Sequence, residues 1–259
     1  MNLSDRFAGR FETVSLAELV SEAELLTRVD RKYLLRANDA VRVLDGVDAT
    51  ARVLEIDGER ASLYGTMYFD TPELLSYRLA ALGRRRRFKL RSRHYVETDA
   101  AFLEMKTRGA RGTTVKERIE QPSDAVDRLT DEGRAYAAEA VESLGLGAEV
   151  ADELEPTLHT GYRRTTLLLP EGARATVDTD LEWLDAWGGR MSRPDLVIVE
   201  TKSAARASSL DRLLWRAGIR PVGISKFATG LAAMRPELPS NKWSRVLRTH
   251  FDAQPALAA

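Results

Sequence analysis

The stretch that decides the fold is residues 84–95, which read RRRRFKLRSRHY. In an extended strand successive side chains point to opposite faces, so residues two apart share a face. This alternation places Phe88 and Leu90 together on one face. The other face collects the basic side chains of Arg85, Arg87, Lys89, Arg91 and Arg93. The pattern therefore predicts a strand from Arg85 to Val96 with one apolar and one basic face.

The same alternation recurs in six further segments, each with a charged face and a largely apolar face. The charged faces carry Asp30 and Lys32, Glu104 and Lys106, Lys116 and Arg118, Arg164, Arg174 with Asp178 and Asp180, and Glu200 and Lys202. Any single strand of this kind is more typical of an ordinary sheet with one face in water. All seven strands carry such a charged face, and these faces are mostly basic although the chain is neutral overall. This favours a segregated basic surface that binds an anion.

Eight strands are predicted, mostly in neighbouring hairpins, at residues 28–35, 60–69, 85–96, 101–107, 113–120, 158–169, 174–181 and 195–203. Helices are predicted at residues 15–26, 38–46, 70–83, 123–144, 208–218 and 225–234, the second of them capped by Asn38. This order indicates an α+β fold with one large antiparallel sheet. Because eight antiparallel strands can close on themselves, we expect a closed β-barrel with flanking helices and a basic interior.

The composition excludes several classes of protein. The 259 residues include 39 Lys and Arg against 39 Asp and Glu, and this neutrality argues against a generally basic nucleic-acid binder. No cysteine is present, which excludes disulfides and thiolate metal sites and fits a reducing compartment. No apolar run is long enough to span a bilayer, and the first residues lack the apolar core of a secretory signal. We therefore expect a cytoplasmic protein without a membrane segment.

The seven lysines are more informative than the 32 arginines. Six of them lie on the alternating segments or in the Ser225-Lys226-Phe227 stretch, and only Lys242 lies elsewhere. Lysine approaches phosphate oxygens as a point charge, whereas arginine clamps them with a planar fork. Both residue types, together with one or two carboxylates that hold a divalent metal, suit a polyphosphate ligand.

A set of short motifs in this order resembles the VTC-type polyphosphate polymerase domain of the triphosphate tunnel metalloenzymes, which include the CYTH proteins. The motifs are Asp30-Arg31-Lys32-Tyr33, Tyr68-Phe69-Asp70-Thr71-Pro72, Lys89-Leu90-Arg91-Ser92-Arg93, Glu104-Met105-Lys106, Val199-Glu200-Thr201-Lys202 and Ser225-Lys226-Phe227. The resemblance runs from about Arg28 to Met234. It implies an N-terminal helical segment at residues 1–27, a tunnel domain at 28–236 and a C-terminal tail at 237–259.

The resemblance also implies which residues do what. Lys32, Arg91, Arg93, Lys106, Lys202 and Lys226 would contact the reacting phosphates, and Lys116, Arg164 and Arg174 would hold further phosphates, joined by Lys89 and Arg118 on the same faces. Glu200 would bind a divalent metal, Mn²⁺ or Mg²⁺, with Glu104 as a second ligand. Arg164 is preferred to Arg163 because it shares a face with Tyr162. The chain departs from the family at Asp30, where a glutamate is usual.

The implied activity is an ATP-polyphosphate phosphotransferase that moves the γ-phosphoryl group of ATP to a polyphosphate chain and releases ADP. Two alternatives remain open at this point: a triphosphatase of the same fold, and a non-catalytic module that binds polyphosphate or a nucleotide. A nucleic-acid surface at residues 84–93 is disfavoured, because alternation turns most of those charges toward the predicted interior, although Arg84 and Arg86 are left unexplained. Three scattered histidines, His94, His159 and His250, do not suggest a metal site.

Overall fold

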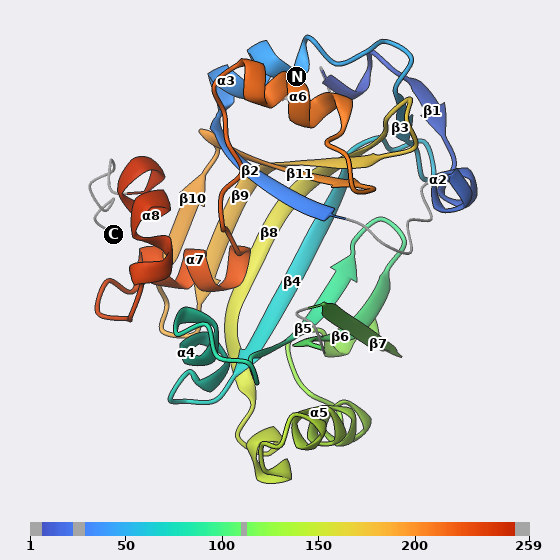
Figure 1. Cartoon of the computed structure of the whole chain (residues 1–259). Coiled ribbons are helices and arrows are strands. Elements are labelled where there is room, and N and C mark those ends of the chain that lie inside the picture. The colour runs from blue at the N-terminus through green and yellow to red at the C-terminus, as the bar shows by residue number, and fades with distance from the viewer. Residues whose placement is uncertain (1–6, 23–28, 110–112, 252–259) are drawn as a thin grey trace. The chain divides into compact units, whose positions relative to one another are not determined.

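A computed structural model describes residues 7–22, 29–109 and 113–251 (Figure 1). Its strands are β1 (Glu12–Val14), β2 (Val29–Arg36), β3 (Arg52–Leu54), β4 (Ser62–Asp70), β5 (Phe88–Tyr95), β6 (Ala100–Arg108), β7 (Thr114–Gln121), β8 (Glu155–Leu168), β9 (Arg174–Asp185), β10 (Arg190–Arg193) and β11 (Leu196–Ser203). Its α-helices are α2 (Leu16–Glu22), α3 (Ala37–Leu44), α4 (Leu75–Ala81), α5 (Asp131–Ser143), α6 (Ser209–Arg216), α7 (Lys226–Met234) and α8 (Ser244–His250). Short 3-10 turns are η2 (Ser123–Ala125), η3 (Ala148–Ala151) and η4 (Asn241–Trp243). The expected α+β class, with a large antiparallel sheet, is confirmed.

The hydrogen-bonded order of the main strands is β2-β11-β9-β8-β4-β5-β6-β7, with the short strands β1, β3 and β10 off this path. Within the described part of the chain no pairing joins β2 to β7, so the strand order does not confirm the predicted closed barrel. The sheet has eleven strands where eight were predicted. The three additional strands are three or four residues long, too short to show a two-residue alternation in the sequence.

The chain forms two compact units. Unit 1 comprises Met1–Leu63, Tyr162–Glu182 and Ser192–Ile224. Unit 2 comprises Tyr64–Gly161, Trp183–Met191 and Ser225–Ala259. Strands β4, β8 and β9 contribute residues to both units, whereas the main buried apolar clusters lie within one unit each, so each unit is described separately below.

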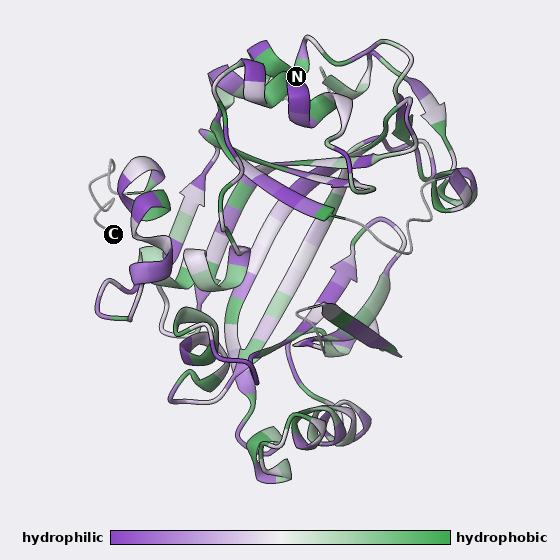
Figure 2. Cartoon of the chain, in the orientation of Figure 1, coloured by the Kyte–Doolittle hydropathy of each residue, from purple (hydrophilic) through white to green (hydrophobic). Residues whose placement is uncertain are grey.

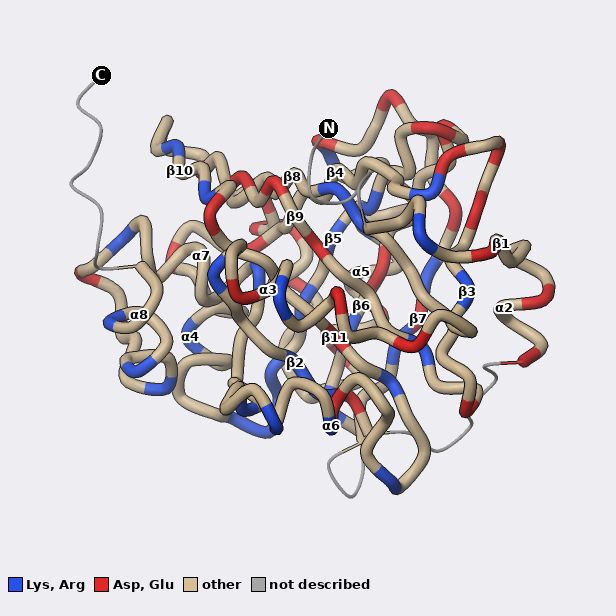
Figure 3. Tube along the Cα trace, turned by 90° about the horizontal axis from the view of Figure 1, so that it is seen from above, with Lys and Arg blue, Asp and Glu red and all other residues tan. Residues whose placement is uncertain are grey.

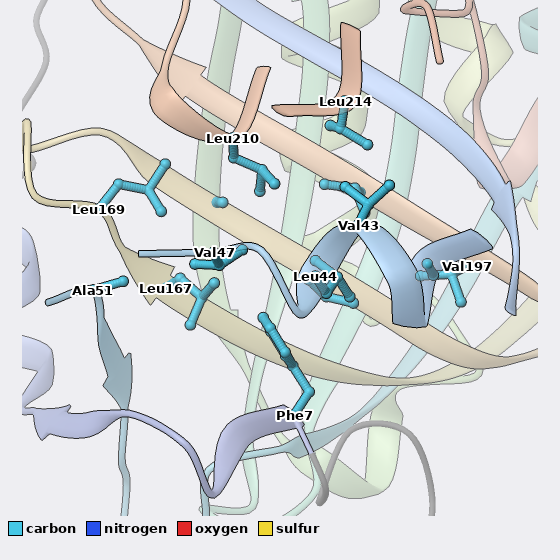
Figure 4. Close-up of a cluster of buried hydrophobic side chains, with 14 of the residues drawn as sticks. Phe7, Val43, Leu44, Val47, Ala51, Leu167, Leu169, Val197, Leu210 and Leu214 are labelled. Atoms are coloured by element: carbon cyan, nitrogen blue, oxygen red, sulfur yellow. The ribbon is translucent and has the colours of Figure 1, made fainter. Parts of the chain in front are cut away.

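The core of unit 1 lies where α3 and α6 cover the apolar face of β2, β11 and β9. Val43 of α3 lies on the side of Leu214 of α6, and Leu44, Leu210 and Val197 belong to the same cluster (Figure 4). All five side chains are buried. Helix α3 follows directly from β2, because Arg36 occupies the N-cap position in an extended conformation. The prediction that Asn38 caps this helix was therefore wrong.

The core of unit 2 is built on β5, β6 and α5. Leu90, Leu103 and Met105 are fully buried and pack with Ala137 and Val141 of α5. They lie on the faces that alternation assigns to apolar residues, and Figure 2 shows the resulting bands of hydrophobic and hydrophilic residues along the strands. Apolar residues on one face of a strand thus select the face that packs against a helix.

Strand β5 begins at Phe88, three residues later than predicted. Gly83 adopts a left-handed φ of +66° and ends α4, and the chain then turns through residues 84–87. Backbone hydrogen bonds from Arg84 N to Leu79 O and from Arg87 N to Arg84 O hold this turn. Arg85 therefore lies in a turn and not on the basic face of the strand, as the alternation had predicted.

Two other helix predictions need correction. The single helix expected at residues 123–144 is interrupted, since η2 is followed by α5, whose N-cap Thr130 accepts a hydrogen bond from Gly133 N. The C-terminal tail contains η4 and α8, which were not predicted. Trp243 of η4 is buried and the centre of its ring lies 5.9 Å from that of Tyr77, so this segment packs against α4. The end of the first predicted helix, residues 23–26, lies outside the described residues.

Asp70 organises the start of α4 in unit 2. Its side chain is fully buried, and its Oδ1 accepts hydrogen bonds from Thr71 N at 2.9 Å and Ser76 N at 2.7 Å. Its Oδ2 accepts one from Tyr77 N at 2.9 Å. The bonds from Ser76 and Tyr77 satisfy amide groups that a helix N-terminus leaves without intrahelical partners, and the bond from Thr71 fixes the turn before the helix. Leu74 precedes the helix with a left-handed φ of +59°. The hydrogen bonds of Asp70 offset the energetic cost of this conformation.

We expect Asp70→Ala to lower the free energy of unfolding by about 2–4 kcal/mol, because three buried amide donors lose their acceptor. Asp70→Asn keeps one acceptor oxygen and should lower the free energy of unfolding by clearly less than Asp70→Ala. Urea unfolding of the two variants and the wild type measures the difference. Equal stability of Asp70→Ala and the wild type would show that this network does not stabilise the fold.

Candidate functional site

The residues predicted to form the site divide between the two units. Unit 1 contains Lys32, Arg164, Arg174, Glu200 and Lys202. Unit 2 contains Lys89, Arg91, Arg93, Glu104, Lys106, Lys116, Arg118 and Lys226. Figure 3 marks the basic positions in blue and the acidic positions in red.

In unit 2 the strand register brings six of the basic residues onto one face of β5, β6 and β7. Arg91 lies opposite Glu104, which lies opposite Arg118. In the next row Lys89 lies opposite Lys106, which lies opposite Lys116. Arg93 shares this face one row further along. Because directly paired residues point to the same side of a sheet, the predicted grouping of these six side chains is correct.

Glu104 lies at the centre of this basic face and is completely buried. Arg91 donates to its Oε2 from Nε at 2.8 Å and from a terminal nitrogen at 2.6 Å. The Nζ of Lys116 forms an ion pair with Oε1. Both carboxylate oxygens are thus matched to cations, and Glu104 holds two of the predicted phosphate-binding side chains in place.

The electrostatics of Glu104 follow from this pairing. Burial raises its pKa, but the charges of Arg91 and Arg93 and the hydrogen bond from Lys116 have the larger combined effect, lowering the pKa to about 2. Burial lowers the pKa of Lys116, an effect that its bond to Glu104 opposes. Glu104 therefore stays ionised at any physiological pH.

The aromatic side chains on this face hold further cations. The Arg118 guanidinium lies 4.3 Å from the centre of the Phe102 ring, and that of Arg93 lies 5.6 Å from the centre of the Tyr64 ring. Such contacts orient a guanidinium without neutralising its charge.

Lys89 contacts the N-cap residue of α7, and Lys226 directly follows that residue. Lys89 Nζ donates to Ser225 Oγ at 2.7 Å, and the same hydroxyl caps α7 by accepting from Ala228 N. Lys226 is the first residue of that helix, and its carbonyl accepts from Trp183 Nε1 at 2.8 Å. The two predicted phosphate ligands are therefore anchored at one helix N-terminus, where the helix dipole favours an anion.

In unit 1 the acidic and basic residues of β2 and β11 face one another. Glu200 lies opposite Lys32 in the register, and Lys202 is two residues further along the same face. Glu200 Oε2 is 4.0 Å from Lys32 Nζ, and its Oε1 is 3.8 Å from Lys202 Nζ. Both separations exceed hydrogen-bond length. The carboxylate, whose side chain is 18% exposed, lies between two cations without being clamped by either.

The two candidate metal ligands differ in how well they suit a divalent cation. Glu200 presents a partly exposed carboxylate, whereas both oxygens of Glu104 are already paired with cations. The described residues contain no group of three or more acidic or histidine side chains placed to hold a metal ion. Mg²⁺ and Mn²⁺ are often bound by one or two carboxylates, with phosphate oxygens and water completing the shell. Glu200 therefore fits such an ion, and Glu104 fits it less well.

Arg164 and Arg163 are separated by their contacts. Arg164 forms a two-pronged ion pair with the buried Asp178, with distances of 2.6 Å and 2.8 Å. Arg163 points to the other side, where it donates to Ala61 O and lies 4.0 Å from Asp180. Asp180, which adopts a left-handed φ of +52°, is thus near Arg163 and not near Arg164. The alternation had placed Asp180 with Asp178.

The opposite face of the same motifs builds a buried polar network that the sequence analysis missed. Tyr33 and Thr201 both donate to Asp211 Oδ1, at 2.7 Å and 2.6 Å, and Ser208 donates to Oδ2 from its amide and its hydroxyl. Burial raises the pKa of Asp211, but these hydrogen bonds lower it further than burial raises it. The network joins β2, β11 and α6. The Ser208-x-x-Asp211 capping pattern was the sequence signal for it.

A sheet whose strands collect lysines and arginines around isolated carboxylates is characteristic of a protein that binds a polyanion. The family model described as the VTC domain matches residues 27–235 of this chain. The chain therefore belongs to the VTC domain family, which confirms the resemblance seen in the motifs.

The chain is also similar in fold to solved structures. A protein from Hippeastrum with a reported dominant triphosphatase activity is 17% identical, with a TM-score of 0.51 over 83% of this chain and 100% of that chain. A protein from Pyrococcus horikoshii is 14% identical, with a TM-score of 0.44 over 79% of this chain and 98% of that chain. A search of curated proteins gives no match. None of the described helices combines the length and apolar character needed to cross a membrane.

Replacing Glu104 tests the central ion-pair cluster of unit 2. We expect Glu104→Gln to lower the free energy of unfolding at pH 7 by about 3–5 kcal/mol, because it leaves Arg91 and Lys116 without their counter-charge. A carboxyl whose pKa is lowered by folding stabilises the protein above its unfolded pKa and loses that effect as it becomes protonated. The difference between variant and wild type should therefore shrink as the pH falls from about 4.5 to about 2.

Denaturant unfolding at several pH values measures this difference. Glu117→Gln is the matched control, since Glu117 lies on the opposite face of β7 and is exposed. A difference that does not change with pH would contradict the assignment of a lowered pKa to Glu104.

Proposed function

We propose that this chain binds ATP and inorganic polyphosphate on the basic faces of its strands and transfers the γ-phosphoryl group to the polyphosphate chain. The observation that carries the proposal is the position of Glu200 between Lys32 and Lys202, in a chain of the VTC domain family. These three residues supply a carboxylate for a divalent cation and two cations for phosphate oxygens on one face. A closed eight-stranded tunnel, as the family resemblance implies, is part of the proposal.

The reaction needs no nucleophile from the protein. A terminal oxygen of the polyphosphate chain forms a bond to the γ-phosphorus of ATP, the bond from that phosphorus to the β–γ bridging oxygen breaks, and ADP leaves. A divalent cation bound at Glu200 would supply electrostatic stabilisation of the phosphate oxygens. Lys32 and Lys202 in unit 1 would hold phosphate oxygens and neutralise the charge that develops during transfer.

The cations of unit 2 are proposed to act in the same way. Arg91 and Lys116 are held by Glu104 and present donors that are already oriented, so little reorganisation is needed when phosphate binds. Lys106 and Arg93 extend the same face, and Lys226 adds a charge at the N-terminus of α7. Arg164, which its two-pronged pair with Asp178 holds in one orientation, would add a further charge for phosphate, and Arg174 lies at the start of β9.

A hydrolase is the second candidate, since the Hippeastrum structure with the same fold has a reported triphosphatase activity. In that reaction water attacks in place of polyphosphate, and the same cations serve.

The experiment incubates the purified chain with ATP and Mn²⁺ and follows polymer, ADP and free phosphate. We expect ADP release together with growth of a polyphosphate chain. Free phosphate without polymer would establish the triphosphatase instead. Tight binding of polyphosphate without turnover, with Mn²⁺ or with Mg²⁺, would show that the chain is a non-catalytic module that binds polyphosphate.

Glu200→Gln should lower turnover by about a hundredfold or more, because it removes the negative charge that would hold the metal. Calorimetric titration with Mn²⁺ in the presence of tripolyphosphate should show weaker metal binding by the variant. Glu182→Gln is the matched control, since Glu182 is an exposed glutamate of unit 1 on β9. Turnover by Glu200→Gln at the rate of the control would contradict the role given to Glu200.

A further inference from the structure

Thr176 of β9 lies in one row with Lys32 and Glu200 in unit 1. The register places Glu200 of β11 opposite Lys32 on one side and opposite Thr176 on the other. Directly opposed residues of an antiparallel pair point to the same face, with Cβ atoms about 4.5–5.5 Å apart. The side chain of Thr176 is therefore an immediate neighbour of the Glu200 side chain.

The hydroxyl of Thr176 is buried and, within the described part of the chain, forms no hydrogen bond. Thr176 is 6% exposed, and its Oγ1 is shielded from solvent without a partner among those residues. A buried hydroxyl that lacks a partner costs free energy, and most buried polar side chains in proteins are paired. An unpaired hydroxyl beside a carboxylate therefore indicates that its partner is part of a bound ligand.

Thr165 of β8 has the same kind of hydroxyl in a different setting. It too is buried, and its Oγ1 has no partner among the described residues. It lies on the opposite face of the strand from Arg164 and shares that face with Leu167 of the apolar core. Thr176, by contrast, shares its face with a carboxylate and several cations, the surroundings that suit a ligand.

The charged side chains next to Thr176 supply nitrogen donors and a carboxylate that is already paired. Arg174 and Lys202 form the next row, opposite one another, and their nitrogen atoms suit phosphate oxygens. Asp178, two residues along β9, gives both carboxylate oxygens to Arg164. The hydroxyl of Thr176 thus adds what these cations do not supply, an uncharged oxygen that can act as a ligand.

A divalent cation bound at Glu200 needs more oxygen ligands than one carboxylate offers. Mg²⁺ and Mn²⁺ take about six oxygens in an octahedral arrangement. Serine and threonine hydroxyls hold Mg²⁺ beside phosphate groups in other nucleotide-binding sites. Thr176 is placed to serve in this way, because it lies directly opposite the carboxylate.

We infer that Thr176 is a second oxygen ligand of the divalent cation at Glu200, in direct contact or through a bound water. The inference rests on the proposed function, because it adds a residue to the cation site of that proposal. Threonine carries no charge, so the charged faces of the strands do not reveal this role in the sequence. The free energy that the fold loses by burying the unpaired hydroxyl is recovered when the cation binds.

The test measures the affinity of Thr176→Val for tripolyphosphate by titration calorimetry, once in excess Mn²⁺ and once in EDTA. Valine keeps the branched shape of threonine and removes the hydroxyl. We expect the affinity in Mn²⁺ to fall about tenfold or more, the usual effect of losing a group that supports a bound metal. The affinity in EDTA should stay within about twofold of the wild type, because the phosphate-binding cations are unchanged.

Two further variants control for changes in packing. Thr176→Ser keeps the hydroxyl and should bind tripolyphosphate in Mn²⁺ within about threefold of the wild type. Thr165→Val removes a buried hydroxyl from the other face of a strand in the same unit and should bind as the wild type does. Urea unfolding of metal-free Thr176→Val should show a midpoint no lower than that of the wild type, since no hydrogen bond is lost.

The outcomes separate this inference from the proposed function. If Glu200→Gln keeps the affinity that Mn²⁺ adds, or if Mn²⁺ adds none to the wild type, the cation site of the proposed function is overturned together with the role of Thr176. If Glu200→Gln loses that gain while Thr176→Val keeps it, the role of Thr176 alone is overturned. An equal loss by Thr176→Val in EDTA, or a lower urea midpoint, would also overturn it, because the hydroxyl would then bind phosphate or support the fold.

Discussion

The structure depends on the two-residue alternation of its strands, which places like charges side by side on one face. Lys89, Lys106 and Lys116 form a single row across three paired strands, and such a row repels itself unless an opposite charge is near. In unit 2 that charge is the buried Glu104, which binds Arg91 and Lys116. In unit 1 it is Glu200, between two lysines. Each carboxylate allows a basic face to fold before any phosphate is bound.

The same alternation gives each family motif two functions. In Asp30-Arg31-Lys32-Tyr33 the Lys32 side chain faces Glu200, while Tyr33 faces the other way and donates to Asp211. In Val199-Glu200-Thr201-Lys202 the hydroxyl of Thr201 reaches the same aspartate. The residues that position α6 and the residues proposed to bind phosphate thus alternate along two paired strands. A one-residue slip in register would disrupt both sets at once.

The sequence predicted the parts of the site that depend on alternation within a strand. The sharing of one face by Glu200 and Lys202, and by Lys89, Arg91 and Arg93, is of this kind, and the class of fold followed from the same pattern. It did not predict contacts between distant elements, such as Asp211 with Tyr33, because these depend on which helix packs on which strand. The strand start at Arg85 was wrong because a glycine-ended helix and a turn override the alternation before Phe88.

The most direct test of the account compares two neighbouring residues on opposite faces of β2. Lys32→Gln should weaken tripolyphosphate binding, measured by calorimetry, while leaving the free energy of unfolding close to that of the wild type. Arg31→Gln should do the reverse, because Arg31 faces Ser203 and Asp211. Equal effects of the two variants on tripolyphosphate affinity would contradict the claim that one face of the strand binds phosphate and the other holds the fold.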